Sequence, residues 1–428
     1  MKIILFIFLI LYTSAIYSQS GWQQQSIVYT NQAAVTDVFF INPNTGWFCG
    51  QFGILSKTTN SGINWIHVPT SNNYNHNCIF FINENTGWVG LGTYFSTYYR
   101  GFILKTTTGG NTWVADTLPE EYNIVSKITF INLTTGWASA KGVYKTTNAG
   151  LTWSRYFVQG YEIYDIRSIS FPDLNTGYCS GTFYNNYTGE RRDIISKSTN
   201  GGLNWQIIRQ ESSFSGSYRS YYDLQFLDNN TGYLCGNPPI KTTNGGNSWF
   251  NIMENTIYYS MHFINSNTGW FGKWDYSAIT TNGGTSWVNQ TISALTLFHG
   301  IYFVNETTGW GVGLNTASYP KVFRTTSGGF TGIQPISTEI PKQFSLSQNY
   351  PNPFNPMTKL KFQMSKGAFA KLTVFDVLGR EVATLVNEQL QPGTYEVDFD
   401  GSNLPSGVYY YKLETETFTE TKKMVLIK

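Results

Sequence analysis

The sequence NTGW stands at residues 44–47, 85–88 and 267–270, and close variants of it occur four more times. The variants are TTGW at 134–137 and 307–310 and NTGY at 175–178 and 230–233. Successive glycines of this motif are separated by 41, 49, 41, 55, 37 and 40 residues. A period of about 40–50 residues that holds several short strands is typical of the blades of a β-propeller.

Each repeat begins with an apolar segment that ends in phenylalanine shortly before the motif, at positions 40, 81, 130, 171, 226, 263 and 303. Asn or Thr before Gly suits the left-handed backbone of a hairpin connection. The aromatic residue after the glycine would then begin a second strand and pack between blades. We therefore interpret the motif as a structural turn and not as seven copies of a binding site.

A second motif follows in every repeat and ends in tryptophan in six of them. The six copies are KTTNSGINW (57–65), KTTTGGNTW (105–113), KTTNAGLTW (145–153), KSTNGGLNW (197–205), KTTNGGNSW (241–249) and ITTNGGTSW (279–287). The seventh copy, RTTSGGFTG (324–332), lacks the tryptophan, whereas Trp22 follows the start of the mature chain without a repeat of its own. An N-terminal strand that completes the last blade closes the ring and protects its edges, so we expect seven blades.

The second motif resembles the Asp-box of bacterial neuraminidase (BNR) repeats, with Asn at 60, 148, 200, 244 and 282 where that family has Asp. The whole repeat is more similar to the propeller repeats of the photosystem II assembly factor, over about residues 20–332. The resemblance implies a propeller and says little about activity, because one fold carries many functions.

The composition agrees with an all-β chain. Aromatic residues make up 17% of the 428 residues, charged residues only 13%, and the net charge is +2. A nucleic-acid binder would need a basic stripe, and a disordered chain would be poor in aromatic residues, so both classes are excluded.

The first 18 residues have the pattern of a signal peptide. Lys2 precedes an apolar run over residues 3–12, and small and polar residues follow it. The run is too short to cross a bilayer. We therefore expect an exported protein that is not transmembrane, with a propeller over residues 19–332.

A linker is predicted over residues 333–343, and a small Ig-like β-sandwich over 344–428. The sandwich is predicted from alternating strands separated by turn residues, at 359–364, 370–379, 394–400, 406–416 and 419–428.

This last segment resembles the C-terminal sorting domain of proteins carried by the type IX secretion system. The matching residues are 349–356, Asp376, Gly379, Arg380, 406–409 and 423–428. The resemblance implies a sorting signal that includes Gly379, Arg380, Gly407, Tyr409, Lys423 and Lys428. It also implies recognition by the type IX machinery, delivery to the surface or outside of a gram-negative cell, and removal of the domain.

No cofactor or metal is expected. The cysteines at 49, 78, 179 and 235 show neither a CxxC motif nor metal-ligand spacing. We expect them to be buried free thiols, since free cysteine behaves as a small core residue.

A glycan-cleaving enzyme is the main alternative to a binding protein. The Arg-Ile-Pro motif of sialidases is absent, and xyloglucan-cleaving relatives use two facing propellers with paired carboxylates. Asp37 and Asp223 share one repeat position, but blades one and five lie across the ring from each other. The four histidines form no pattern with Ser or Cys, so we predict no catalysis.

Binding is expected on the face opposite the two repeated turns, because the long insertions fall there and variable loops on a rigid scaffold usually carry binding. These insertions are rich in Tyr and Arg, which suit sugars or protein partners. A second candidate set stands four residues before each phenylalanine, at positions 36, 77, 126, 167, 222, 259 and 299. The predicted ligand-binding residues are Arg167, Arg219, Tyr222, Tyr259, Trp274 and His299. We therefore predict a non-catalytic surface propeller that binds a polysaccharide or a protein, with a sialidase-like or xyloglucanase-like hydrolase and an adhesion scaffold as alternatives.

Overall fold

The computed structural model divides the chain into two compact units, residues 20–330 and residues 331–428, and each is described by itself. The structure describes residues 21–29, 32–70, 73–95, 98–121, 124–158, 163–184, 191–212, 221–253, 256–274, 276–292, 297–329, 333–337, 340–390, 392–401 and 404–428. The predicted signal peptide (1–18), Arg219 and most of the insertion around Arg219 lie outside these ranges.

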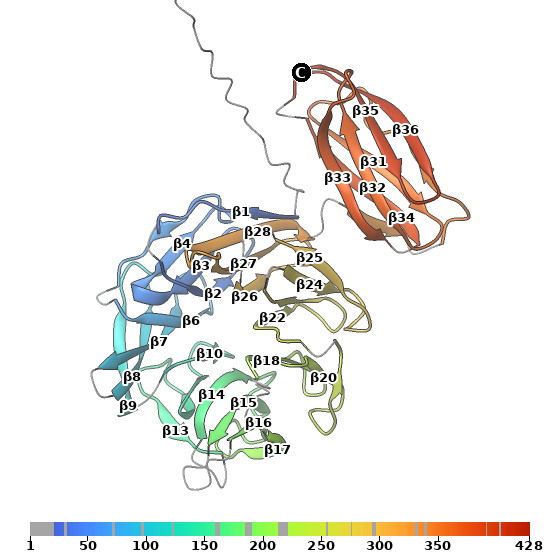
Figure 1. The fold of residues 1–428 in the computed structure, drawn as a ribbon. Helices are drawn as coiled ribbons and strands as arrows, with labels where there is room; N and C mark the ends of the chain where they lie inside the picture. The colour runs from blue at the N-terminus through green and yellow to red at the C-terminus, as the bar shows by residue number, and fades with distance from the viewer. Residues whose placement is uncertain are drawn as a thin grey trace, which may run out of the picture. The chain divides into compact units, whose positions relative to one another are not determined.

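The first unit is a seven-bladed β-propeller, each blade a four-stranded antiparallel sheet, as the sequence predicted (Figure 1). The innermost strands are β2 (Val35–Phe40), β6 (Asn75–Phe81), β10 (Lys127–Phe130), β14 (Ile163–Ser170), β18 (Asp223–Phe226), β22 (Ser260–Phe263) and β26 (Leu297–Phe303). The second strands are β3 (Gly46–Gly50), β7 (Gly87–Phe95), β11 (Gly136–Ala140), β15 (Gly177–Tyr184), β19 (Gly232–Cys235), β23 (Gly269–Gly272) and β27 (Gly309–Leu314). The third strands are β4 (Leu55–Thr58), β8 (Tyr98–Thr106), β12 (Gly142–Thr146), β16 (Arg191–Ser198), β20 (Ile240–Thr242), β24 (Tyr276–Thr280) and β28 (Pro320–Gly329). The outer strands are β5 (Ile66–His67), β9 (Val114–Glu121), β13 (Ser154–Tyr156), β17 (Gln206–Ser212), β21 (Phe250–Asn251), β25 (Val288–Thr291) and β1 (Gly21–Gln24). A short 3-10 helix, η1 (Gln51–Gly53), connects β3 to β4.

The ring is closed by the N-terminal strand. β1 pairs antiparallel with β28 and becomes the outer strand of blade seven. Trp22 on this strand is buried and lies edge-on to Phe303, with ring centroids 5.6 Å apart. The same edge-on contact joins Phe40 to Trp65 in blade one, at 5.8 Å. Trp22 therefore takes the place of the tryptophan that the seventh repeat lacks, as predicted.

One end of the propeller carries both repeated turns; we call it the turn face, and the opposite end, where the innermost strands begin, the loop face. At the turn face the aromatic residue of each NTGW-type turn stacks on the phenylalanine of the following blade. The seven stacked pairs are Trp47–Phe81, Trp88–Phe130, Trp137–Phe171, Tyr178–Phe226, Tyr233–Phe263, Trp270–Phe303 and Trp310–Phe40, with centroids 3.3 to 3.6 Å apart. The last pair joins blade seven to blade one. The sequence prediction that this aromatic residue packs between blades is confirmed.

The glycine of the NTGW turn serves a different purpose from the one predicted. None of the seven glycines has a left-handed backbone, and none of the residues before them does either. A Cβ atom at Gly87, for example, would lie 2.5 Å from the ring of Phe81 on the adjacent strand. The glycine is required because the phenylalanine ring occupies the space above its Cα.

The left-handed residues of the turn face lie in the second turn. Gly201 and Gly202 of blade four have φ of 70° and 85°. The Asn200 side chain closes this turn by accepting a hydrogen bond from the backbone N–H of Asn204 at 2.9 Å. Asn thus performs here the turn-closing role that the Asp-box resemblance would give to Asp.

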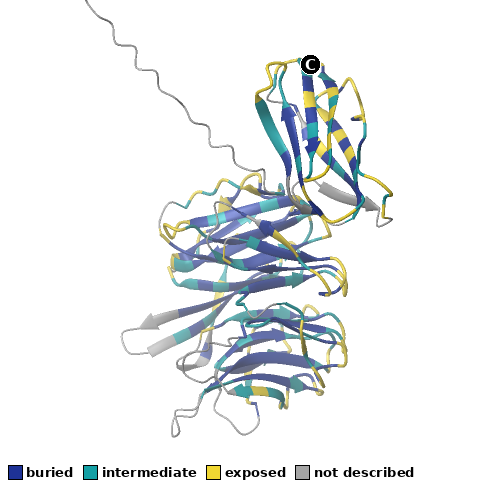
Figure 2. Cartoon of the chain, turned by 45° about the vertical axis from the view of Figure 1, so that its right-hand side comes forward, coloured by how far each residue is buried: buried dark blue, intermediate teal, exposed yellow. Residues whose placement is uncertain are grey.

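Among the described residues of the propeller, the apolar core is divided into seven clusters, and each one combines residues of two adjacent blades. Buried residues follow the strands within the blades, and exposed ones concentrate in the turns and outer strands (Figure 2). The four cysteines are all buried and free, as predicted. The protein therefore stabilises its propeller by packing at the blade interfaces.

Two of the predicted loop-face insertions are extended hairpins. In blade two, β7 and β8 continue until Phe95 pairs with Tyr98, and in blade four β15 and β16 continue until Tyr184 pairs with Arg191. The insertions therefore lengthen the strands themselves and do not only add loop.

The second unit consists of two four-stranded sheets that enclose one hydrophobic core, which agrees with the predicted small sandwich. One sheet has the order β29 (Ile333–Ser337), β34 (Gly393–Asp400), β31 (Met357–Met364) and β30 (Ser345–Leu346). The other has the order β33 (Glu381–Leu390), β32 (Ala368–Phe375), β35 (Gly407–Glu414) and β36 (Thr419–Leu426).

Two features of this unit correct the sequence analysis. Residues 333–337, predicted as the start of a linker, form strand β29, because their backbone pairs with the edge of β34 from Ile333↔Val397 to Ser337↔Thr394. Strand β33 was not predicted, since its sequence EVATLVNEQL mixes polar and apolar residues without strict alternation. It is stabilised by pairing along the whole length of β32.

Candidate ligand-binding site

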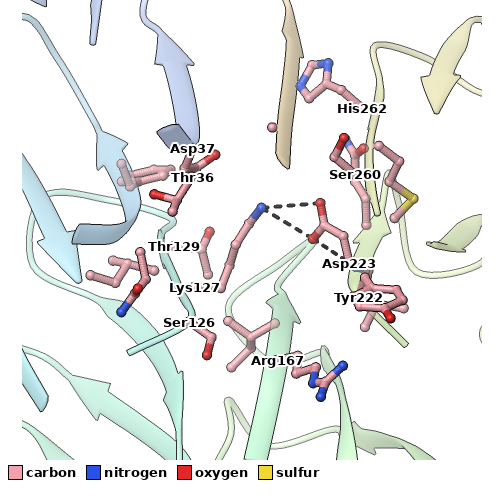
Figure 3. Close-up of a pocket in the computed structure, with 18 of the residues that line it drawn as sticks. Thr36, Asp37, Ser126, Lys127, Thr129, Arg167, Tyr222, Asp223, Ser260 and His262 are labelled. Carbon is pink, nitrogen blue, oxygen red and sulfur yellow. Dashed lines mark hydrogen bonds and ion pairs between the residues drawn. The ribbon is translucent and has the colours of Figure 1, made fainter. Parts of the chain in front are cut away.

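A cavity of about 760 Å³ runs into the ring and is lined by residues from all seven blades. Figure 3 shows these side chains converging from the innermost strands and the segments that precede them. A volume of this size lies within the range of about 300–1,000 Å³ found for small-ligand sites. The cavity is therefore the first candidate for a binding site.

The seven residues four positions before each phenylalanine all line this cavity: Thr36, Asn77, Ser126, Arg167, Tyr222, Tyr259 and His299. We call them the mouth ring, because each one lies on or just before the innermost strand of its blade, on the loop-face side of the repeat phenylalanine. Four of the six predicted binding residues belong to it, namely Arg167, Tyr222, Tyr259 and His299. A repeat position chosen from the sequence thus becomes one continuous ring around a cavity.

Four side chains from blades four, five and six form an arc at the mouth. The guanidinium of Arg167 lies over the ring of Tyr222 at 5.5 Å, and Tyr222 lies 5.0 Å from Tyr259 between ring centroids. Trp274, which is half exposed, donates a hydrogen bond from Nε1 to the Tyr259 hydroxyl at 2.8 Å. We call these four residues the aromatic arc. The arc connects Trp274, a fifth predicted residue that does not itself line the cavity, to the mouth ring.

The opposite wall of the mouth is small and polar. It comprises Thr36, Asn77 and Ser126, from blades one, two and three. The Thr36 hydroxyl donates to the backbone carbonyl of His76 at 2.6 Å, which fixes it in place. His299 completes the mouth ring. Burial lowers the pKa of its imidazole, so this side chain is neutral near pH 7. The mouth thus has one aromatic wall and one polar wall.

A cross-ring ion pair that the sequence analysis did not predict lies below the mouth. Lys127 Nζ of blade three lies 3.3 Å from Asp223 Oδ1 of blade five, as Figure 3 shows with dashed lines. Asp37 of blade one is near enough to favour the charged form of the same lysine. All three residues stand three positions before a repeat phenylalanine. The sequence signal that could have predicted the ion pair is therefore the charged residue at this repeat position in blades one, three and five.

Both carboxylates are fixed by further hydrogen bonds. Asp37 accepts from the backbone N–H groups of Val38 at 2.9 Å and Ile79 at 3.0 Å. Asp223 accepts from the Ser168 hydroxyl at 2.8 Å and from the backbone N–H of Leu224 at 3.0 Å.

The pKa shifts follow from burial and from the ion pair. Burial raises the pKa of Asp37, although Lys127 and the two N–H donors partly oppose that shift. Burial alone would lower the pKa of Lys127, but Asp223 and Asp37 outweigh it and raise that pKa. The lysine therefore stays charged and links blades one, three and five electrostatically.

The cavity ends toward the turn face in a partly aromatic layer. Phe39 lies 5.3 Å from Phe80 and 5.0 Å from Tyr302 between ring centroids, and His262 lies 4.4 Å from Tyr302. Burial lowers the pKa of His262 to about 3, and the positive charge of Lys127 adds to this effect. His262 is thus a neutral residue of the cavity lining that accepts a hydrogen bond from the N–H of Phe303 at 3.3 Å.

No cluster of three or more His, Cys, Asp or Glu side chains that could hold a metal ion occurs within the part of the chain that the structure describes. Nor does any helix in that part have the length and apolarity needed to span a membrane.

The predicted sorting-signal residues lie at two turns and along strand β35 and the C-terminal segment of the second unit. Asp376 closes the turn before β33: it accepts backbone hydrogen bonds from Leu378 and Arg380 and pairs with the Arg380 side chain at 2.7 Å. Gly379 has a φ of 75° in this turn. Gly407 begins β35, and Tyr409 on the same strand is buried and donates a hydrogen bond from its hydroxyl to the Pro405 carbonyl. Lys423 lies opposite Tyr410 on the neighbouring strand. The backbone N–H of Lys428 donates a hydrogen bond to the Ser406 hydroxyl.

The comparison with protein families decides the role of this second unit. Residues 348–428 match the secretion system C-terminal sorting domain. The chain is therefore delivered by the type IX secretion system to the surface or the outside of a gram-negative bacterium. A search of curated proteins finds no match to the chain.

Solved structures support the propeller fold. The structure titled YCF48 bound to D1 peptide is 17% identical, with a TM-score of 0.52, and the alignment covers 73% of this chain and 96% of that one. YCF48 from Cyanidioschyzon merolae is 16% identical, with a TM-score of 0.52 over 71% of this chain and 98% of that one. The GH74 xyloglucanase from Xanthomonas campestris is 11% identical, with a TM-score of 0.50 over 80% of this chain and 59% of that one. At these identities the similarity establishes the fold alone.

Proposed function

We propose that this chain is an exported, non-catalytic propeller that binds a polysaccharide at the loop-face mouth of its central cavity. The observation that carries the proposal is the pairing of the aromatic arc with the polar wall of the mouth ring. A sugar ring presents an apolar C–H face and a rim of hydroxyl groups. The arc suits the first and the polar wall suits the second.

Contacts among the side chains of the arc, which fix their positions, also support a binding role. The Tyr259 hydroxyl accepts the Trp274 indole N–H, and Arg167 is held over Tyr222, so the side chains support one another before any ligand arrives. A site whose side chains are already fixed loses less conformational entropy on binding.

The absence of catalysis is part of the proposal and is supported by the state of the carboxylates. A glycosidase needs one carboxyl group that donates a proton and a second that acts as base or nucleophile. Asp37 has both oxygens bonded to backbone N–H groups, and Asp223 is paired with Lys127. These existing contacts support the proposal that neither group exchanges a proton with a ligand at the mouth.

A protein partner is the second candidate, because Tyr, Trp and Arg are also frequent anchors in protein interfaces. The cavity behind the arc, of about 760 Å³, favours the polysaccharide. A chain end or a branch can enter a cavity of this size, whereas a typical protein interface is spread over about 800 Å² on each partner.

A glycan array and a hydrolysis assay, run with the full chain on the same polysaccharides, test the proposal. We expect binding without turnover, and a loss of at least about tenfold in affinity for Tyr222→Ala and Trp274→Ala, since each removes a stacking surface. Tyr319→Ala, a partly exposed tyrosine of blade seven outside the cavity lining, is the matched control and should bind like the wild type. Turnover that disappears in Asp223→Asn would establish a hydrolase instead.

A further inference from the structure

Among the described residues, three carboxylates line the cavity, and two of them, Asp37 and Asp223, are already engaged as acceptors. The acceptors of Asp37 are both engaged, and Asp223 accepts from a hydroxyl, a backbone N–H and the ammonium of Lys127. A ligand donor directed at Asp37 or Asp223 would have to compete with these contacts. A ligand that offers acceptors would not.

Arg167 is the principal free donor of the mouth. Its Nε pairs with Asp165 Oδ2 at 3.1 Å, on the same strand, and its guanidinium lies over Tyr222. Among the described residues its two Nη groups have no hydrogen-bond partner, although about a quarter of the side-chain surface is exposed. The guanidinium is therefore anchored at one nitrogen and presents the other two as a fork.

Two further donors point to the same chemistry. Asn77 Nδ2 has no partner within the described residues, and Asn77 lines the cavity across from the arc. Lys127 has three N–H groups and pairs closely with one carboxylate, and about a third of its side-chain surface is accessible. Donors therefore come from blades two, three and four, which follow one another around the ring.

We infer that the polysaccharide bound at the mouth carries an anionic group, a carboxylate or a sulfate ester, that is held by the Nη fork of Arg167. A guanidinium binds two oxygens of such a group in parallel hydrogen bonds, and these are about twice as strong as neutral ones. This inference rests on the proposed function and names the ligand class for the same site.

The charges around Arg167 restrict where the anionic group can lie. Asp165 occupies the Nε side, and Asp223 lies below, neutralised by Lys127. The acidic group must therefore approach the Nη side from the open mouth, while the rest of the sugar stacks on Tyr222 and Tyr259. The recognition is directional, because the cavity as a whole has no excess of positive charge.

The test is a calorimetric titration of the full chain with three oligosaccharides of similar length: an oligogalacturonate, a sulfated galactan fragment and a neutral galactan fragment. We expect at least about tenfold tighter binding of one or both anionic oligosaccharides, with a preference that declines as salt screens the charge. Arg167→Gln should weaken the binding of the anionic oligosaccharides at least about tenfold, to the level of the neutral fragment. Arg167→Lys should restore only part of the preference, because a lysine keeps the charge but not the fork.

Arg155→Gln, at a cation–π pair outside the cavity, is the control and should keep the preference. Equal affinity for neutral and anionic oligosaccharides, lost in Tyr222→Ala, would overturn the anionic assignment and leave the proposed function intact. An anionic preference that survives in Arg167→Gln would also overturn it. Failure of all polysaccharides to bind would overturn the proposed function itself.

Discussion

The repeat positions are nearly uniform in residue type at the turn face of the propeller and varied at its loop face. At the turn face all seven blades place a phenylalanine, a glycine and a stacking aromatic residue in the same contacts. At the loop face the mouth ring contains seven residues of six different types. Contacts between blades require identical parts, because each blade must fit the next, whereas the mouth faces solvent and is free to vary. The repeated end therefore carries stability, and we expect the varied end to carry recognition.

The sharpest test of this division compares two aromatic truncations. Phe303→Ala would remove the ring stacked on Trp270 at 3.5 Å and edge-on to Trp22 at 5.6 Å, so we expect a loss of about 3–5 kcal/mol in the free energy of unfolding. Tyr259→Ala at the mouth should cost much less. Urea denaturation of both variants checks this, and equal losses would contradict the division.

A second, smaller effect should follow from adding one carbon at the turn face. In Gly87→Ala the new Cβ would lie 2.5 Å from the Phe81 ring, so we expect overpacking to cost about 1–3 kcal/mol. Gly407→Ala is the control, because nothing lies within 4 Å of a Cβ at that site. The midpoints of thermal unfolding measure both changes. An unshifted midpoint in Gly87→Ala would refute the steric role of this glycine.

Acid should lower the stability of the propeller through His262, which lies in the partly aromatic layer below the cavity. Folding lowers the pKa of His262 from its usual 6.5 to about 3, so the unfolded chain binds a proton as pH falls below 6.5 while the folded chain does not. Stability is thus present above pH 6.5 and is lost as pH falls toward 3, by about 1 kcal/mol between pH 7 and 5.5. His262→Gln keeps an acceptor for the Phe303 N–H and should flatten this part of the pH profile. An unchanged profile would show that His262 does not contribute.

The smallest effect on stability should come from the mouth. Arg167→Gln and Trp274→Ala change side chains at the solvent-facing mouth, about a quarter exposed in Arg167 and half exposed in Trp274, so each should shift the free energy of unfolding by no more than about 0.5 kcal/mol. Both variants should nevertheless bind polysaccharide more weakly. A variant that loses stability and binding together would mean that the mouth also supports the fold.

The sequence alone was sufficient to predict the propeller, because the residues that make the turn-face contacts recur at the same positions in every repeat. Trp22 could be assigned to blade seven, and the mouth ring could be named, from spacing alone. The pairing of Lys127 with Asp223 escaped prediction, since it depends on how far side chains reach across a closed ring. Strand β29 escaped it as well, because its pairing with β34 joins segments about 60 residues apart. In both cases the deciding contact is long-range and leaves no local pattern.

The closure of the ring by β1 also has a consequence in time. The strand that holds Trp22 is made among the first residues of the propeller, but its partner β28 (Pro320–Gly329) is made among the last. During synthesis, β1 therefore has no partner strand until the residues of the seventh blade have been added to the chain. Contacts between such distant segments form slowly, so we expect the final pairing, and not the assembly of any single blade, to set the pace at which the propeller matures.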